Sequence, residues 1–68
     1  MKNFIKVERA KRDITQAELA DQLKVSRQTI NSIELGKFIP STVLSLKIAA
    51  FFKVKFEDLF ILEDEDWE

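Results

Sequence analysis

The sequence predicts an all-α fold, a compact five-helix bundle, for a chain of 68 residues. Three segments begin directly after residues that cap helix N-termini, at Thr15, Ser26 and Ser41. Apolar residues within the segments recur at helical spacing, as Ile30 and Ile33 do. A single Gly and a single Pro interrupt the chain. A chain of this length forms one small domain, so its helices must pack closely.

Composition excludes several classes of function. The chain has no cysteine and no histidine, which removes disulfides, thiolate metal sites, the commonest general base and every Ser-His or Cys-His arrangement. We therefore expect neither an enzyme nor a metal or other cofactor. No secretory signal and no run of about 20 apolar residues is present, so we expect a cytoplasmic protein with no membrane contact.

The net charge of −1 hides a strong asymmetry. Residues 1–55 hold eleven Lys and Arg and five acids, a net charge of +6, whereas residues 56–68 hold seven acids and no base. A basic body with an acidic end can still bind phosphates through its basic face. We expect residues 1–62 to form the domain and residues 63–68 a solvated acidic tail. Trp67 lies in a disordered end or packs back onto the body or a second subunit.

Two helices open the chain. The first begins at Phe4 and Ile5 and runs to about residue 12. Thr15 and Glu18 then spell a capping box that starts a second helix over residues 16–23. The expected buried side of this second helix comprises Ala17, Leu19, Ala20 and Leu23.

The third helix begins after Ser26 and ends at Gly36, where a left-handed residue is favoured. The tight link at residues 24–25 forces it to cross the second helix steeply, which is the helix-turn-helix arrangement. Ile30 and Ile33 share one side. The other side carries side chains suited to base edges, although an ordinary solvated helix face has the same composition: Arg27, Gln28, Asn31 and Ser32.

Two apolar helices close the domain, over about residues 42–53 and 56–61. The amides at the start of the fourth helix, with the hydroxyls of Ser41 and Thr42, either bind a phosphate or serve only as a cap. The apolar surface exceeds what a short helix buries in a small domain, which indicates an interface with a second copy. We expect this dimer interface at Phe51, Phe56, Leu59, Phe60 and Ile61.

Residues 15–20, 25–30 and 33–37, followed by Pro40-Ser41 and residues 56–60, resemble the Cro-type phage-repressor family, also called the xenobiotic-response-element (XRE) type. The likeness covers about residues 5–60 and implies a lambda-repressor-like DNA-binding domain of the compact bacterial kind. It implies an ion pair between Arg9 and Glu34. It further implies that Arg27 and Gln28 read bases and that Thr29 and Ser32 touch bases or backbone. Lys37 would contact a phosphate, and Gln16 would bind a phosphate and brace the third helix. To these we add Asn31 as a base-reading residue and Ser26, Ser41 and Thr42 as phosphate-binding residues.

Two residues depart from the family pattern. Lys24 stands where many relatives have Gly, and a positive φ at this position would strain it. Leu35 replaces a polar residue on the expected DNA side. It either touches a thymine methyl or is a partly exposed leucine at a frayed helix end.

These observations predict a sequence-specific transcriptional regulator that binds double-stranded DNA. We expect a repressor that occupies a pseudo-palindromic operator as a homodimer, with half-sites about 34–36 Å apart. No small-molecule ligand is indicated. The alternative is an antitoxin or accessory subunit that acts mainly through a protein partner.

Overall fold

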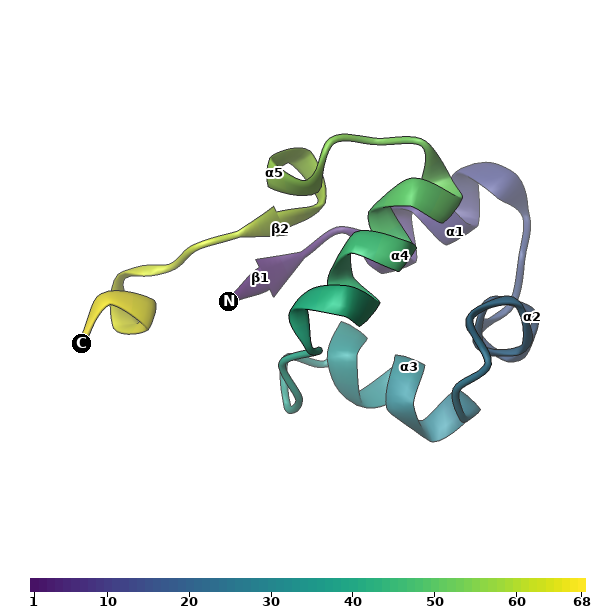
Figure 1. Cartoon of the computed structure of the whole chain (residues 1–68), viewed down its shortest axis with the longest axis horizontal. Coiled ribbons are helices and arrows are strands. Elements are labelled where there is room, and N and C mark those ends of the chain that lie inside the picture. Colours follow the sequence, from purple (N-terminus) through teal and green to yellow (C-terminus); the bar gives the residue numbers. More distant parts are fainter.

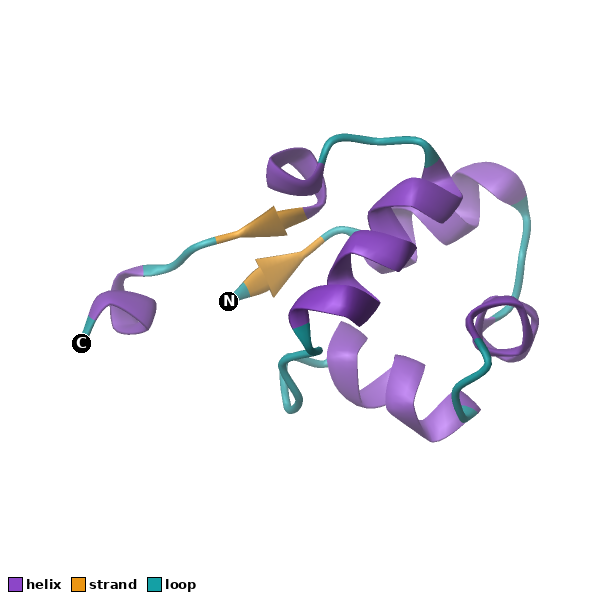
Figure 2. Cartoon of the chain, in the orientation of Figure 1, coloured by secondary structure: helices purple, strands orange, loops and turns teal.

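The computed structural model describes residues 1–68, and helices dominate it (Figure 1). None of these helices is both long and apolar enough to cross a bilayer. Figure 2 shows one small sheet beside the helices. In chain order the elements are β1 (Lys2–Asn3), α1 (Ile5–Arg12), α2 (Gln16–Leu23), α3 (Arg27–Glu34), α4 (Thr42–Phe52), α5 (Phe56–Leu59), β2 (Phe60–Ile61) and a 3-10 turn, η1 (Asp64–Trp67).

The caps predicted from the sequence are formed. Thr15 accepts a hydrogen bond from the Glu18 amide, and Glu18 accepts one from the Thr15 amide, so the capping box at the start of α2 is complete. Ser26 and Ser41 cap α3 and α4 in the same way, each accepting from the amide three residues on. Each cap satisfies an amide that the helix itself leaves unpaired.

The core is one apolar cluster that receives residues from nearly every element. Ala17 is an exception to the prediction for α2, because it is exposed while the other three predicted residues are buried. The cluster comprises Ile5, Leu19, Ala20, Leu23, Ile30, Ile33, Ile48, Ala49, Phe52, Leu59 and Phe60.

The end of the domain differs from the prediction of a fifth helix over residues 56–61. Helix α5 stops at Leu59, and β2 then pairs antiparallel with β1, in the register Lys2↔Ile61 and Asn3↔Phe60. The Phe4 amide donates to the Leu59 carbonyl at 3.0 Å, which brings the two ends of the chain together. Hydrogen bonding to β1 replaces the last helical turn.

This geometry corrects the predicted dimer interface at two positions. Leu59 is 0% exposed and Phe60 is 5% exposed, so both side chains belong to the core of a single copy. The turn from α5 into β2 directs them inward. Neither residue is available to a second subunit.

The acidic tail is tied to the start of the chain rather than left as a disordered end. The Met1 amine lies 3.1 Å from a carboxylate oxygen of Asp66 and 3.3 Å from one of Glu63. Asp66 also accepts from the Glu63 amide at 2.7 Å, which closes η1. Trp67 is 77% exposed, so it does not pack back onto the body. The tail projects from the end of the molecule that carries the two strands (Figure 1).

Candidate nucleic-acid interface

Helices α2 and α3 form a helix-turn-helix unit, joined by the short link of residues 24–26. Lys24 ends α2 in the left-handed conformation (φ 59°), and its amide bonds back to the Ala20 and Asp21 carbonyls. Val25 is partly buried against the core, and Ser26 then starts α3. The predicted strain at Lys24 is therefore present, because a side chain at positive φ crowds its own backbone.

Helix α3 has one buried and one exposed side. Ile30 is 0% exposed and Ile33 is 1% exposed, so the helix is anchored by these two side chains. The opposite side exposes Arg27, Gln28 and Asn31. This exposed side carries a guanidinium and two amides, the groups that pair with guanine and adenine edges in a major groove.

A polar network fixes the C-terminal half of α3. Arg9 of α1 donates to Glu34 through two nitrogens, at 2.7 and 3.0 Å, and through its third to the Ile14 carbonyl at 3.0 Å. Gln16 donates to Glu34 at 3.1 Å and to the Asn31 side-chain oxygen at 3.1 Å. Helices α1 and α2 thus hold the same turn of α3.

The Arg9–Glu34 pair is largely withdrawn from water. The two side chains are only 14% and 6% exposed. Its two parallel hydrogen bonds to Glu34 raise the pKa of Arg9, more than partial burial lowers it. Because its two hydrogen bonds are parallel, a bidentate pair fixes geometry as well as adding stability. The pair therefore sets the orientation of α3 relative to α1.

The network also defines which hydrogen bonds remain for DNA. Both hydrogens of the Gln16 amide are used within the protein, so Gln16 must exchange one of these bonds before it can donate to a phosphate. Asn31 accepts through its oxygen and keeps its amide hydrogens free. In this arrangement the free hydrogen-bonding groups of the Asn31 side chain are donors.

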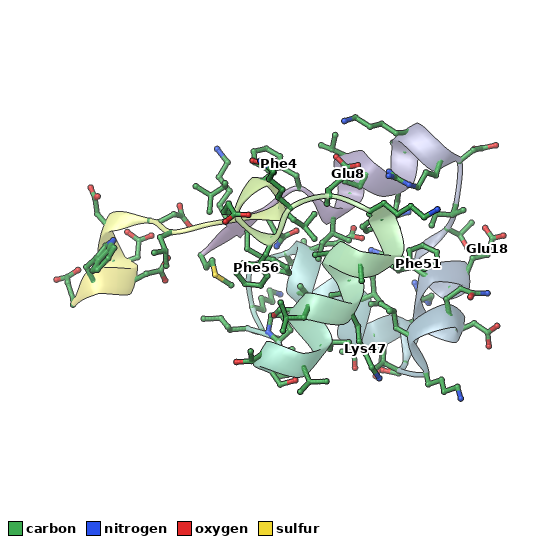
Figure 3. The ribbon with its side chains drawn as sticks, turned by 45° about the horizontal axis from the view of Figure 1, so that its top comes forward. Phe4, Glu8, Glu18, Lys47, Phe51 and Phe56 are labelled. Carbon is green, nitrogen blue, oxygen red and sulfur yellow. The ribbon has the colours of Figure 1, made fainter.

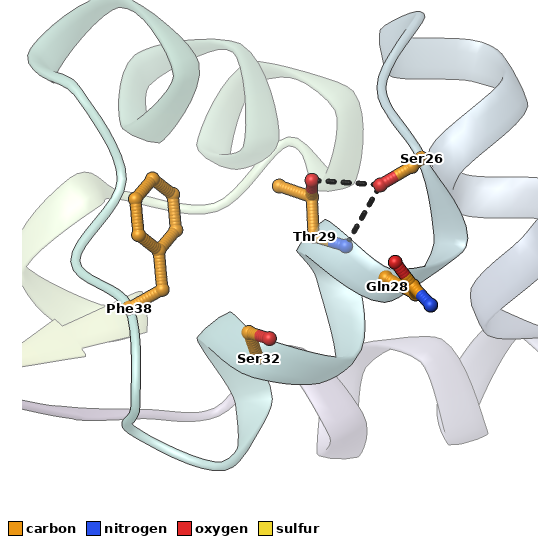
Figure 4. A pocket seen from close by; sticks show the side chains of 5 residues that line it. All are labelled: Ser26, Gln28, Thr29, Ser32 and Phe38. Carbon is orange, nitrogen blue, oxygen red and sulfur yellow. Dashed lines mark hydrogen bonds between the residues drawn. The ribbon is translucent and has the colours of Figure 1, made fainter.

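A shallow hollow of about 280 Å³ lies beside α3, lined by Ser26, Gln28, Thr29, Ser32 and Phe38 (Figure 4). Thr29 and Ser26 share a hydrogen bond between their hydroxyls at 2.8 Å, which orients both beside the hollow. Phe38, 49% exposed, forms the opposite wall.

Phe38 is a candidate contact residue that the sequence prediction missed. An aromatic ring beside Gln28 and Ser32 can pack on a thymine methyl group. The signal in the sequence was an exposed aromatic directly after Gly36-Lys37, between two elements expected at the DNA. Its place beside α3 depends on how the loop folds back.

The remaining predicted contact residues lie around this surface. Lys37 is exposed just beyond the end of α3, where Gly36 takes φ 76°. Ser41 and Thr42 are exposed at the start of α4. Leu35, at the end of α3, is 59% exposed, which leaves it free to touch DNA or solvent.

The three predicted dimer residues that are not in the core are distributed over the molecule. Phe51 shares a hollow with Ile14 and Glu18 of the α2 side, whereas Phe56 stacks on the buried Phe60 ring at 5.2 Å. Figure 3 shows Phe51 and Phe56 well apart. Ile61 is partly buried in β2. The predicted residues therefore do not form one continuous patch.

Comparison with known proteins agrees with this geometry. Residues 5–59 match a helix-turn-helix family model. The chain is 56% identical over 66 residues to an uncharacterized HTH-type transcriptional regulator of Methanocaldococcus jannaschii, covering 97% of this chain and 100% of that one. It is 48% identical over 69 residues to another from Archaeoglobus fulgidus (100% and 97% covered) and 44% identical over 66 residues to YgzD of Bacillus subtilis (97% and 100%). This chain belongs to the XRE-type helix-turn-helix family of DNA-binding transcriptional regulators.

Proposed function

We propose that the protein is a transcriptional repressor that binds a pseudo-palindromic operator as a homodimer, with α3 in the major groove. The observation that carries the proposal is the division of α3 into a buried side, Ile30 and Ile33, and an exposed polar side. Two such helices related by a two-fold axis would meet half-sites one helical turn apart, about 34–36 Å. Occupation of promoter DNA is sufficient for repression, so no ligand is required.

The side chains divide into two roles. Arg27, Gln28 and Asn31, with Thr29 and Ser32 beside them, read base edges. Lys37 neutralises a phosphate, and the hydroxyls of Ser26, Ser41 and Thr42, near the starts of α3 and α4, add contacts to the DNA backbone. Phosphate contacts fix position and base contacts choose sequence, so variants of the two groups should behave differently.

The test begins with selection of binding sites from random duplexes by the purified protein. Symmetric sites with half-sites about one helical turn apart would support the proposal, as would a dimer by mass measurement on DNA. Asymmetric sites bound by one copy would contradict the homodimer. Binding that shows no sequence preference would contradict base reading by α3.

Two substitutions then separate the roles. Gln28→Ala is expected to relax selection at one base position by about 1–3 kcal/mol, with Gln22→Ala, an exposed glutamine of α2, as the matched control. Lys37→Ala is expected to weaken operator and random DNA alike and to lower the salt slope by about one. Lys55→Ala, between α4 and α5, is its control, because that loop lies at the opposite end from α3 (Figure 1). Equal losses for Gln28→Ala on both DNAs would reject its assigned role.

A second candidate function is that of an antitoxin or accessory subunit with a protein partner. The observation in its favour is that two apolar side chains of α4 are exposed, Val43 (64%) and Leu46 (53%). Exposed apolar patches often mark sites of protein–protein contact. Purification with a stoichiometric partner of different mass would favour it. A homogeneous homodimer that binds its operator alone would favour the repressor.

A further inference from the structure

The last turn of α3 is hydrogen-bonded to a residue near the N-terminus of the chain, Asn3. A helix leaves its final carbonyls without intrahelical partners. The Ile33 carbonyl accepts from the Gly36 amide at 3.0 Å and from the Asn3 side-chain amide at 2.8 Å. Asn3 lies 30 residues away in the sequence, so this second bond is tertiary.

Asn3 uses both ends of its side chain. Its oxygen accepts from the Ile5 amide at 3.2 Å, at the start of α1, where the N-cap residue Phe4 provides no side-chain bond. Its nitrogen faces the Ile33 carbonyl. An amide offers a donor and an acceptor together, whereas an ionised carboxylate of nearly the same shape only accepts. The two partners thus require Asn in this orientation.

The backbone of Asn3 is itself held by the paired chain ends. Asn3 is opposite Phe60 in the β1–β2 ladder, and the Phe60 side chain is buried in the core. Two residues earlier the Met1 amine binds the carboxylates of Glu63 and Asp66. The donor to α3 is therefore carried by a short sheet that the two ends of the chain form together.

We propose that Asn3 is a positioning residue for α3 and couples the alignment of its C-terminal half to the pairing of β1 with β2. Asn3, Arg9 and Gln16 hold the turns that carry Asn31 and Ser32. The first turn, with Arg27 and Gln28, is held by its own cap at Ser26. Binding residues need to be held within about 0.5 Å of their productive geometry, so loss of one support moves the distal turn first. This inference rests on the proposed base reading by α3.

The discriminating variant is Asn3→Asp. It keeps the acceptor for the Ile5 amide and places a carboxylate opposite the Ile33 carbonyl, so the start of α1 stays capped while the link to α3 is lost. Asn3→Ala removes both side-chain bonds without adding charge, so it replaces Asn3→Asp in the test if that variant folds poorly. Val54→Ala, at a partly buried residue between α4 and α5, controls for a general loss of stability.

The readout is the base-selection profile, divided into positions sensitive to Gln28→Ala and positions sensitive to Asn31→Ala. Asn3→Asp is expected to lower discrimination about fivefold at the Asn31 positions and to leave the Gln28 positions within about twofold. Amide exchange at Gly36 and Lys37 should quicken in the same variant. Val54→Ala should leave both the profile and these amides unchanged relative to the rest of the chain.

Three results would overturn the role of Asn3. One is an Asn3→Asp profile identical to that of the unmodified protein, and another is a uniform loss at all positions. The third is the same change in Val54→Ala. Absence of any base preference in the unmodified protein would instead overturn the proposed function and this inference with it, so the two failures are distinguishable.

Discussion

Removal of the Arg9 guanidinium should strongly destabilise the domain, because Arg9 joins α1 to the last turn of α3. Arg9→Met keeps much of the side-chain volume and leaves the Glu34 carboxylate, 6% exposed, without its cation. Breaking a buried pair in this way destabilises a protein by about 3–5 kcal/mol. Gln16 still donates to Glu34, and Arg9 is 14% exposed, so we expect the lower end, about 3 kcal/mol.

This loss is large for so small a domain. At the usual 0.05–0.15 kcal/mol per residue, 68 residues correspond to about 3–10 kcal/mol of folding free energy. A loss of about 3 kcal/mol would lower the melting temperature by roughly 12–24 °C. Urea unfolding followed by circular dichroism measures the loss directly, with Arg27→Met, at an exposed position of α3, as the control expected within about 0.5 kcal/mol.

A second substitution tests whether the unpaired charge of Glu34 causes the loss of stability. Adding Glu34→Gln to Arg9→Met removes the buried charge, so the double variant should recover about 1–2 kcal/mol relative to Arg9→Met alone. Two results would refute the argument: a loss below about 1 kcal/mol for Arg9→Met, the range of a surface pair, or strictly additive effects of the two substitutions.

Four further outcomes are expected. Lys24→Gly should stabilise the domain by about 0.5–1 kcal/mol in urea unfolding, because glycine adopts the left-handed conformation without strain. The control Lys47→Gly, inside α4, should destabilise the domain by about 1 kcal/mol, and destabilisation by both substitutions would contradict strain at Lys24. The Met1 amine donates a hydrogen bond to Asp66, and this bond, with a weaker one to Glu63, raises the pKa of the amine. Attachment of the tail should therefore be fully present at neutral pH and be lost as pH rises from about 8 through the raised value, seen as a change in Trp67 fluorescence that is absent after Asp66→Asn. Hydrogen bonds donated by the Glu63 amide and then by the Met1 amine lower the pKa of Asp66. The contribution of Asp66 to the attachment of the tail should therefore be fully present above about pH 4 and disappear only in stronger acid. Phe38→Ala should reduce preference for thymine at one operator position by about 1 kcal/mol without changing the salt slope, and an unchanged preference would remove Phe38 from the interface.

Much of the candidate interface was predictable because its signals are local. The Ser26 cap, the Ile30–Ile33 spacing and the glycine after α3 all act within one or two helical turns, and the structure has each of them in place. The place of Phe38 was not predictable in this way. Whether a loop aromatic faces α3 or solvent depends on the path of residues 37–41 between two helices.

The amino-acid sequence by itself determined where the first four helices begin, which sides of α3 are buried and exposed, and the helix-turn-helix class, since capping and apolar periodicity need only neighbours a few residues apart. Tertiary structure alone decided the pairing of β1 with β2, the early end of α5, the burial of Leu59 and Phe60 and the bond from Asn3 to α3. Those features are contacts between residues 30 or more positions apart, or consequences of such contacts. In addition, a strand of two residues is too short to show a periodic pattern. They form because the folded core brings the two chain ends to the same side of the molecule, where unpaired backbone groups satisfy one another.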